Sequence, residues 1–599
     1  MKGTLEADAF VNAARELLNQ EDAVGAERIL APVIHQFKAD APVQHLMGQI
    51  KKAQGQLPEA ERYFRAAIAH DLRSGQYYNE LGLVLQARGA HEDAIKIFRA
   101  ASALVPGLLM VRVSIVRCLM SLGELTEAER EAREYIAIAP GPESWTLLGT
   151  VQRAQERHQD ALVTAETALK YGPSLRGLRY NHATALEKAG RNTEALAVFE
   201  NLARQELDTP DLAHHFARAL YAEGRKQDAE EIAEHGVRLW PNVNALQSTL
   251  SRIRWLGGQG ERCVSANEAA IQARPNALGL RLACADALHR GGHNTKALAV
   301  LDEALRLAPD VPALLTAMGV VLDELDRPLD GLRVLRRAAV VAPSRAAQRN
   351  LLSTLLRAGQ PEEVLRIVNE LRVEQPDEQY LIACATTAMR MVEHPEYRIW
   401  CDYDRFVRTY EIPPPQGFFT IEAFNAGLAV LLRAQHKTNA HPLDQYIPNG
   451  SQTSRSLLSL DEPVIKHFLS AMDVAVRDYA GRLRESDPVG VRRTKNSRYT
   501  GLWSARLTDG GYLPNHVHDR GWISSAYFVS IMPGERPKDP KAGWLKFGEP
   551  NRPPAGCGPE KFIEPQSGML VLFPSYIWHG TVPFEGAERL SLAFDLTPN

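Results

Sequence analysis

The stretch Asn79-Glu-Leu-Gly-Leu-Val-Leu-Gln-Ala-Arg-Gly89, followed by Glu92-Asp-Ala-Ile-Lys-Ile-Phe98, predicts two helices joined by a turn. Its apolar residues recur at helical spacing, so they share one face of each helix. Gly89 stands where the first helix must end, because glycine adopts the left-handed conformation of a helix C-terminus without strain. We therefore expect this stretch to form a pair of antiparallel helices.

The same pattern recurs along the first two thirds of the chain with a period of 34 residues and one interval of 33. A small residue is needed where two helices cross closely, and a glycine marks each turn between them. The crossing positions are Ala26, Ala60, Ala94, Ala128, Ala161, Ala195, Ala229, Cys263, Ala297 and Gly331, and the turn glycines are Gly55, Gly89, Gly123, Gly190, Gly224, Gly258 and Gly292. A fixed period of this length indicates a repeat array.

These units resemble the tetratricopeptide repeat, and about ten or eleven of them cover residues 1–390. The resemblance implies an α-solenoid, a right-handed superhelix of helix pairs with a concave groove. We expect a protein or peptide to bind in this groove. A spacer or dimerisation scaffold is the alternative interpretation.

Composition excludes several classes of partner. The 599 residues carry 69 Lys+Arg and 72 Asp+Glu, so a net charge of −3 gives no electrostatic reason to expect nucleic acid or an anionic membrane. No apolar run approaches the length of a membrane span, and the N-terminus does not read as a signal peptide. The six cysteines are scattered without a CxxC pair, which favours a reducing, cytoplasmic location.

The 34-residue period stops near Pro376, and the composition then changes. We predict a linker at residues 391–418 and a second domain at residues 419–599. Helices are expected at about 419–435 and 462–484, and period-two patterns from Ser497 onward predict short strands separated by turn residues. The expected fold is a double-stranded β-helix, or jelly roll, with a helical lead-in.

Three histidines in the second domain are candidate metal ligands. His516 and His518 are two apart, so on a strand they would point to the same face. His579 follows an apolar strand and a proline turn, and a jelly roll can bring it next to the first two. Three imidazoles suit iron, copper, zinc or nickel.

Arg589 and Ser591 follow His579 and would share one face of a strand. If that face is the interior of the barrel, the guanidinium needs a partner, because an unpaired buried charge is costly. A carboxylate co-substrate would supply one. A structural salt bridge of Arg589 with Glu588 or Asp595 is the alternative.

The order His-x-His, distal His and Arg-x-Ser resembles the iron(II)/2-oxoglutarate-dependent oxygenases over about residues 415–597. The resemblance implies Fe(II), 2-oxoglutarate as co-substrate and O2. It implies that His516 and His579 bind the metal and that Arg589, with Ser591, binds the far carboxylate of 2-oxoglutarate. Tyr527 is a candidate to reach the co-substrate from the neighbouring strand, with core packing as the alternative. No catalytic residue beyond the metal centre is expected.

One position departs from the family pattern, because His518 stands where an Asp or Glu normally completes the ligand set. Three-histidine coordination, coordination by two histidines and water, and rotation of Asp519 into the site all stay open. We therefore expect an oxygenase that hydroxylates a protein or peptide recruited by the repeats. The alternatives are a non-catalytic scaffold with a degenerate barrel and a three-histidine metalloenzyme that does not use 2-oxoglutarate.

Overall fold

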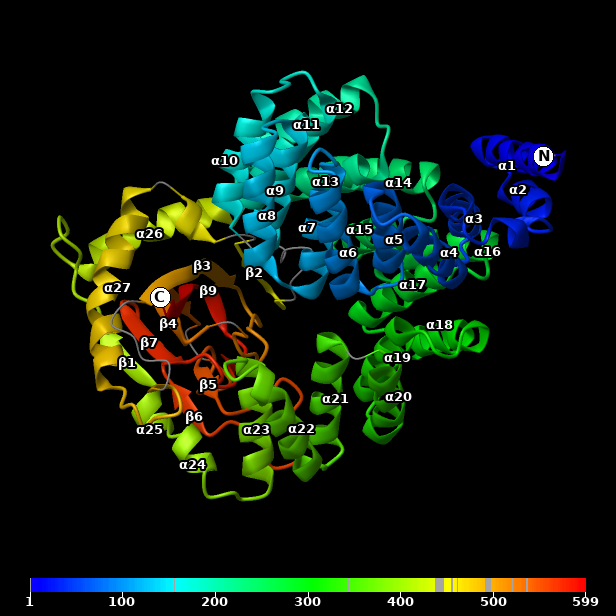
Figure 1. Ribbon diagram of the computed structural model, residues 1–599. Helices are drawn as coiled ribbons and strands as arrows, with labels where there is room; N and C mark the ends of the chain where they lie inside the picture. The colour runs from blue at the N-terminus through cyan, green and yellow to red at the C-terminus, as the bar shows by residue number, and fades with distance from the viewer. Residues whose placement is uncertain are drawn as a thin grey trace. The chain divides into compact units, whose positions relative to one another are not determined.

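The computed structural model describes residues 2–155, 157–342, 344–436, 447–453, 456–460, 462–490, 497–519, 521–534 and 537–598. The chain divides into two compact units, Met1–Ala189 and Gly190–Asn599 (Figure 1). In the described ranges, every helix is too short or too polar to cross a membrane.

Helix pairs build the unit Met1–Ala189. Consecutive helices pack against each other along the chain, as in a solenoid. The helices are α1 (Lys2–Asn19), α2 (Ala23–Leu30), α3 (Ala41–Ala53), α4 (Leu57–His70), α5 (Gly75–Ala87), α6 (His91–Leu104), α7 (Met110–Leu122), α8 (Leu125–Ile138), α9 (Pro142–Ala154), α10 (His158–Leu169) and α11 (Arg176–Ala189), with a 3-10 turn η1 (Ile34–Phe37).

The pair α5 and α6 shows why the repeat needs small residues. A Cβ atom added at Gly82 would lie 2.5 Å from the Phe98 ring, so only glycine lets the two helices approach this closely. Phe98 and Ala94 are fully buried at the contact. Gly89 has a φ of 78° just beyond the end of α5, as its place in the sequence predicts. The predicted helix pair is confirmed.

Gly190–Asn599 continues the helix pairs before the β-rich part begins. Proline occupies the first turn of α13, α19, α20 and α22, where its missing N–H leaves no hydrogen bond unmade. The helices are α12 (Asn192–Gln205), α13 (Pro210–Ala222), α14 (Lys226–Leu239), α15 (Asn244–Leu256), η2 (Gly260–Val264), α16 (Ser265–Ala273), α17 (Leu278–Arg290), α18 (Asn294–Leu307), α19 (Pro312–Glu324), α20 (Pro328–Val341), α21 (Arg345–Arg357), α22 (Pro361–Glu374) and α23 (Gln379–Met391).

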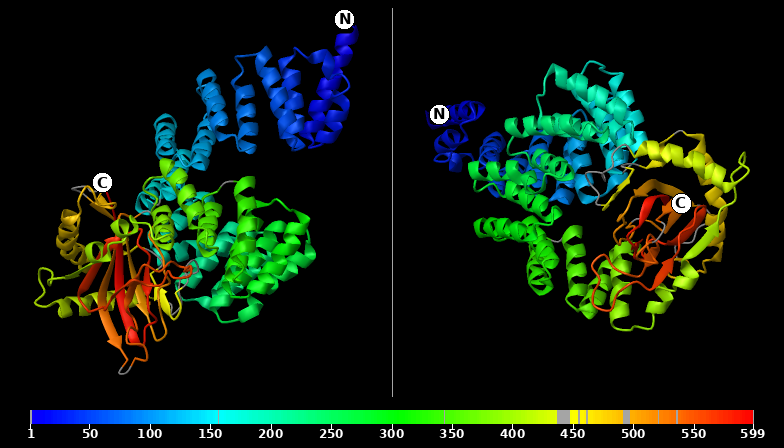
Figure 2. Two further views of the ribbon diagram at one scale, coloured as in Figure 1. Left: turned by 90° about the horizontal axis from the view of Figure 1, so that it is seen from below. Right: turned by 180° about the vertical axis from the view of Figure 1, so that it is seen from behind.

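The C-terminal part is an antiparallel β-rich domain with helices on one side (Figures 1 and 2). Its larger sheet has the order β1-β7-β4-β9-β3-β2, and its smaller sheet has the order β6-β5-β8. The strands are β1 (Arg408–Glu411), β2 (Gly450–Gln452), β3 (Ser497–Leu507), β4 (Ile523–Pro533), β5 (Leu545–Phe547), β6 (Lys561–Ile563), β7 (Met569–Pro574), β8 (His579–Thr581) and β9 (Gly586–Pro598), and the helices are α24 (Tyr397–Trp400), α25 (Tyr403–Phe406), α26 (Ile421–Gln435), η3 (Leu457–Ser459) and α27 (Pro463–Arg482).

The side chains of the central strand β9 alternate between an apolar and a polar face of the sheet. Its even-numbered residues from Leu590 to Leu596 are buried and apolar, and Phe594 packs on Phe468 of α27. Its odd-numbered residues include Arg589, Ser591 and Asp595, which therefore share the opposite, inner face. The helices cover the apolar face, so the polar face is left for the functional groups.

The predicted division into residues 1–390, 391–418 and 419–599 stays a prediction. The helix pairs run to Met391 at the end of α23. The segment predicted as a linker contains the short helices α24 and α25 and the strand β1, which pairs with β7 at the edge of the larger sheet. Part of this segment therefore belongs to the sheet.

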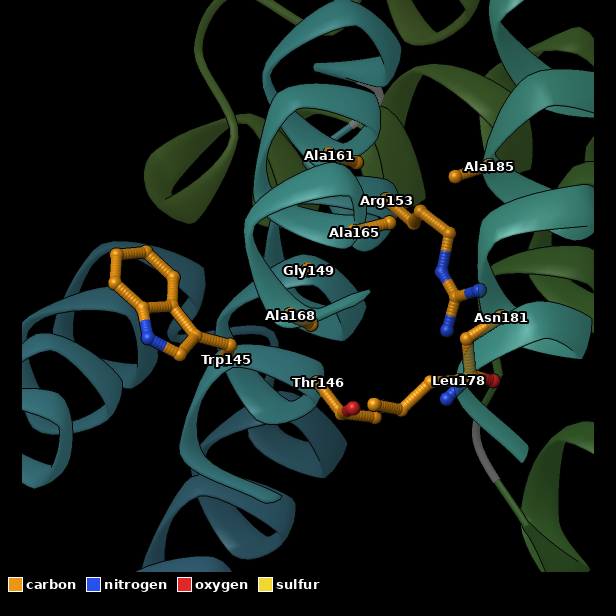
Figure 3. A pocket seen from close by; sticks show the side chains of 10 residues that line it. All are labelled: Trp145, Thr146, Gly149, Arg153, Ala161, Ala165, Ala168, Leu178, Asn181 and Ala185. Carbon is orange, nitrogen blue, oxygen red and sulfur yellow. The ribbon is translucent and has the colours of Figure 1, made fainter. Parts of the chain in front are cut away.

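A groove lies on the unit Met1–Ala189 along α7, α9 and α11. It has a volume of about 780 Å³, and Arg117, Thr146 and Asn181 are among its lining residues. A smaller hollow of about 20 Å³ shares Thr146 and Asn181 with it, and the side chain of Arg153 points into this hollow (Figure 3). The Arg153 guanidinium donates to the hydroxyls of Thr150 and Thr184, but most residues that line the smaller hollow, such as Ala161, Ala165 and Leu178, are apolar. The hollow is about the size of a water molecule.

Candidate metal centre

The backbone brings the three predicted histidines together. The N–H of His516 donates to the carbonyl of His579 over 2.9 Å, and the N–H of His579 donates back over 3.1 Å. The N–H of His518 donates to the carbonyl of Ser575 over 3.0 Å. Only His579 lies in a regular strand, β8, whereas His516 forms an isolated bridge in the segment after β3.

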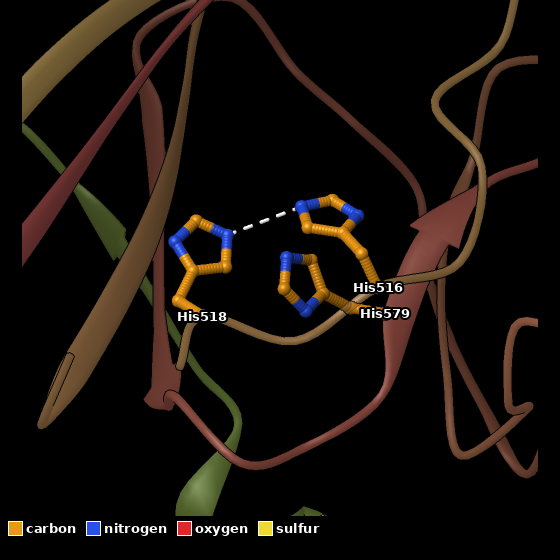
Figure 4. A group of neighbouring side chains, drawn as sticks. All are labelled: His516, His518 and His579. Carbon is orange, nitrogen blue, oxygen red and sulfur yellow. Dashed lines mark hydrogen bonds between the residues drawn. The ribbon is translucent and has the colours of Figure 1, made fainter. Parts of the chain in front are cut away.

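The side chains of His516, His518 and His579 converge on one point (Figure 4). One ligand atom from each lies within 4.8 Å of the other two. The Nε2 atoms of His516 and His518 are 3.1 Å apart, and the rings of His516 and His579 have centroids 4.3 Å apart. Among the described residues, these three histidines are the cluster of His, Cys, Asp or Glu side chains close enough together to hold a metal ion.

The outer ring nitrogen of each histidine has a hydrogen-bond acceptor. Nδ1 of His516 lies 2.8 Å from the carbonyl oxygen of Pro514, and Nδ1 of His579 lies 3.0 Å from that of Ile577. Nδ1 of His518 lies 2.7 Å from Oδ2 of Asp595. Because carbonyl and carboxylate oxygens can only accept, each Nδ1 must carry a proton, and Nε2 is the atom through which each ring would bind a metal.

Burial keeps two of the imidazoles neutral. It lowers the pKa of His516 to about 4 and the pKa of His579 well below its ordinary value. Burial also acts to lower the pKa of His518, but the charge and hydrogen bond of Asp595 outweigh it, so that pKa is raised. Neutral imidazole is the form that binds metal, so His516 and His579 are ready to coordinate at neutral pH.

Asp519, the residue considered as a replacement carboxylate ligand, points elsewhere. Its carboxylate forms a two-pronged ion pair with Arg349 of helix α21. Asp595 instead places its carboxylate behind His518, where its other oxygen accepts from Ser524 over 2.8 Å. In the family pattern a carboxylate is itself a metal ligand. Here the Asp595 carboxylate contacts a candidate ligand, His518, instead.

Arg589 is fully buried and has no carboxylate partner among the described residues. Its guanidinium donates from one Nη to the carbonyl of Gly543 over 2.7 Å and lies over the ring of Phe528. Its Nε is buried and has no hydrogen-bond partner in the part of the chain that the structure describes. Burial lowers the pKa of Arg589 to about 9, and the site therefore favours an anion that would pair with it.

The salt bridges considered for Arg589 are formed by other residues. Glu588 accepts from Arg433 and Arg506 on the apolar side of the sheet. Asp595 accepts from His518. Both candidate carboxylates are thus engaged, and the Arg589 guanidinium is left facing the inner side of the sheet.

Ser591 lies among both small and large side chains on the inner face. It shares that face with Arg589, and its hydroxyl lies 3.4 Å from the carbonyl of Ala505. In the register, Ser591 lies opposite Ala505 of β3 and Phe528 of β4, and Ala593 lies opposite Trp503 of β3. Between Arg589 and Asp595, β9 itself therefore carries short side chains, and aromatic residues flank them on the neighbouring strands.

The structure does not place Tyr527 on the same face of the sheet as Arg589 and Ser591. Tyr527 pairs with Leu592 in the register of β4 and β9, so it points to the apolar face. Its ring packs on Phe468 and its hydroxyl donates to Asn425 of α26 over 2.8 Å. Its neighbour Phe528 takes the inward position. Tyr527 belongs to the packing between sheet and helices, the alternative considered from the sequence.

Sequence reasoning did not assign a role at the metal centre to Asp595. The signal was present, because polar residues alternate with apolar ones along β9 and Asp595 falls in the same phase as Arg589 and Ser591. What the pattern does not show is that the loop after β3 brings His518 back to that end of β9.

Comparison with known families supports both parts of the chain. Residues 501–595 match the family model described as "Putative 2OG-Fe(II) oxygenase". Models described as "Tetratricopeptide repeat" match residues 45–108 and 180–244, and residues 85–150. The chain therefore contains tetratricopeptide repeats followed by a domain of the 2OG-Fe(II) oxygenase type, and this match is consistent with a jelly-roll fold.

Several known proteins are similar to parts of the chain. Human protein O-mannosyl-transferase TMTC1 is 27% identical over 130 residues, which is 21% of this chain and 14% of that protein's length. Yeast Tom70 is 13% identical, covers 67% of this chain and 98% of its own, and has a TM-score of 0.37. A tetratricopeptide repeat protein from Parabacteroides merdae is 17% identical, covers 41% of this chain and 98% of its own, and has a TM-score of 0.30.

Proposed function

We propose that this chain, built from tetratricopeptide repeats and a 2OG-Fe(II) oxygenase domain, is an Fe(II)/2-oxoglutarate-dependent dioxygenase that hydroxylates a protein or peptide. The observation that carries the proposal is Arg589, a buried guanidinium with an unpartnered Nε on the same sheet face as Asp595, the partner of His518. A dicarboxylate that binds the metal at one end would place its other carboxylate where such a cation is needed.

The three histidines fit the metal. His516, His518 and His579 each offer an Nε2 lone pair, and their Nδ1 protons are held by Pro514, Asp595 and Ile577. Fe(II) bound there with 2-oxoglutarate would supply the oxidising power to insert an oxygen atom from O2 into a C–H bond, with succinate and CO2 formed from the co-substrate. Nitrogen ligands of this kind suit Fe(II).

Asp595 offsets the missing carboxylate ligand. Its charge lies against Nδ1 of His518, so the imidazole that faces the metal becomes a stronger electron donor. The Ser524 hydroxyl holds the second carboxylate oxygen and so fixes the direction of the first. Together these contacts supply to three neutral ligands part of the negative charge that an Asp or Glu ligand would bring.

Arg589 and Ser591 would bind the co-substrate. The guanidinium is anchored by Gly543 and Phe528, which leaves its Nε for the incoming carboxylate. Ser591 offers a hydroxyl on the same face, with the small residue Ala505 opposite it on β3. The apolar helix layer behind the sheet keeps water from the other side of this site.

The repeats support a polypeptide substrate. The groove on α7, α9 and α11 has about 780 Å³ and presents both apolar residues, such as Met110 and Leu178, and polar ones, such as Arg117 and Asn181. Tetratricopeptide grooves of this mixed character suit an extended peptide, whose backbone needs polar partners and whose side chains need apolar ones.

Co-substrate turnover tests the proposal. The full chain, loaded with Fe(II), should convert 2-oxoglutarate to succinate in air, and Arg589→Leu should require a much higher 2-oxoglutarate concentration. Arg498→Leu is the matched control. Arg498 is exposed on β3, so this substitution removes a guanidinium outside the site. Equal 2-oxoglutarate dependence in wild type and Arg589→Leu would contradict the assignment of Arg589.

Stability separates a binding role from a structural one. Because no carboxylate pairs with Arg589 among the described residues, Arg589→Leu should leave the thermal unfolding temperature unchanged or raise it. A structural arginine would show the reverse, with the unfolding temperature falling in the variant.

A further inference from the structure

A cavity of about 250 Å³ opens beside His516 and has walls from two parts of the chain. Helices α21 and α23 of the repeats supply one wall, and the loops around the three histidines supply the other. The volume is below the range of roughly 300–1,000 Å³ typical of pockets for whole small ligands. A single side chain suits this space better than a free molecule does.

The repeat wall is tied to the segments that carry the histidines. Arg349 of α21 pairs with Asp519, the residue after His518. The indole N–H of Trp578, the residue before His579, donates to the Thr387 hydroxyl of α23 over 3.2 Å. The last repeats therefore hold a fixed position against the candidate metal centre, and the cavity between them has a defined shape.

The charged groups of the cavity are already neutralised. Arg349 is paired with Asp519 and lies over the Tyr380 ring at 4.0 Å. Arg552 pairs with Asp323 over 2.8 Å and also with Glu324. A charged side chain entering the cavity would find no free opposite charge among these residues and would lose its hydration, which is costly.

Uncharged hydrogen-bonding groups remain available. The carboxamide of Asn350 on α21 lines the cavity and has no hydrogen-bond partner within the described ranges. On the opposite wall, Nδ2 of Asn515 donates to Glu549 over 2.9 Å, and its Oδ1 is fully buried close to Gly580 and not exposed to the cavity. The Asn350 carboxamide offers both a donor and an acceptor, so it is suited to a neutral polar side chain.

We propose that this cavity receives an uncharged polar side chain of the polypeptide substrate and that Asn350, a residue of the repeats, selects it by hydrogen bonding. The proposal rests on the proposed function, because it gives the cavity its role through the adjoining metal centre. It makes the repeat helices α21 and α23 part of the substrate pocket as well as part of the recruiting scaffold.

The test uses the full chain with Mn(II) in place of Fe(II), 2-oxoglutarate and no turnover. The probes are capped pentapeptides with glycine at four positions and asparagine, aspartate or lysine at the centre. Paramagnetic relaxation of the central side-chain protons measures entry next to the metal. We expect the asparagine peptide to bind about tenfold more tightly than the other two, as one added hydrogen bond and one avoided charge burial imply.

The preference should vanish in Asn350→Ala and persist in Asn369→Ala, which removes the same carboxamide from the exposed face of the next helix, α22. Equal binding of the three peptides, or an unchanged preference in Asn350→Ala, would overturn the assignment of the pocket while Mn(II) and 2-oxoglutarate still bind. Failure of the wild-type chain to bind Mn(II) would instead overturn the proposed function, and this inference with it.

Discussion

Nδ1 of His518 lies 2.7 Å from Oδ2 of Asp595, on the side of the ring away from His516. The carboxylate that the oxygenase pattern normally places among the metal ligands thus stands behind a histidine. This relationship explains how a His-x-His sequence can retain negative charge near a metal without a carboxylate ligand.

Asp595→Asn should weaken metal binding about ten- to hundredfold, because it removes that charge while keeping the shape of the side chain. Competition of the chain with a chelator for Zn(II) or Co(II) measures the affinity. Asp478→Asn, on the exposed side of α27, is the control and should bind as the wild type does. Unchanged affinity in Asp595→Asn would show that the carboxylate has no part in holding the metal.

Arg349→Met should weaken metal binding about three- to tenfold, because the ion pair with Asp519 fixes the segment that carries His518. The same chelator competition measures it. Arg336→Met removes an arginine that pairs with Glu363 on the helix surface and should have no effect. If both variants bind metal equally well, the repeats do not support the metal centre.

Ala593→Leu should reduce 2-oxoglutarate affinity at least about tenfold and leave metal affinity unchanged. Ala593 lies between Ser591 and Asp595 on the inner face of β9, so a larger side chain would occupy the space proposed for the co-substrate. Isothermal titration of the Mn(II)-loaded chain with 2-oxoglutarate gives the affinity. A variant that binds 2-oxoglutarate normally would place the co-substrate elsewhere.

The burial of His436 should lower the free energy of unfolding of the chain in acid. It is buried between the hydroxyls of Ser451 and Ser504, and burial lowers its pKa to about 4. An unfolded histidine takes up a proton near pH 6.5, so protonation favours unfolding as the pH falls from 6.5 toward 4. At pH 5.0 this cost is about 2 kcal/mol of the free energy of unfolding.

Urea unfolding of the full chain at pH 7.5 and 5.0 measures this effect. The wild type should lose about 2 kcal/mol more between the two pH values than His436→Gln, which keeps a polar side chain but does not titrate in this range. The same loss in both proteins would assign the acid sensitivity to other groups.

The repeats and the pairing of His516 with His518 were predictable because both follow from local patterns, whereas the approach of His579 followed only from the expected jelly-roll fold. The period of Ala60, Ala94 and Ala128 predicts helix crossings, and those residues are fully buried in the structure. The alternation along β9 predicts a shared face for Arg589 and Ser591, and the register of β9 with β3 and β4 agrees.

The direction of Tyr527 was not predictable from its strand. Residues of β4 are mostly buried on both faces, so alternation of apolar and polar residues does not show which one points inward. A shift of one residue exchanges Tyr527 and Phe528. Contacts such as Arg349 with Asp519 join residues 170 positions apart, and only the packing of the repeats on the barrel determines them.

The most direct test is an anaerobic titration of the full chain with Fe(II) and 2-oxoglutarate, followed by visible absorption. Chelation of Fe(II) by a 2-oxo acid should produce a weak charge-transfer band, absent in His579→Ala and requiring more 2-oxoglutarate in Arg589→Leu than in Arg498→Leu. Bound iron without this band in the wild type would contradict the 2-oxoglutarate assignment and leave a three-histidine centre of different chemistry.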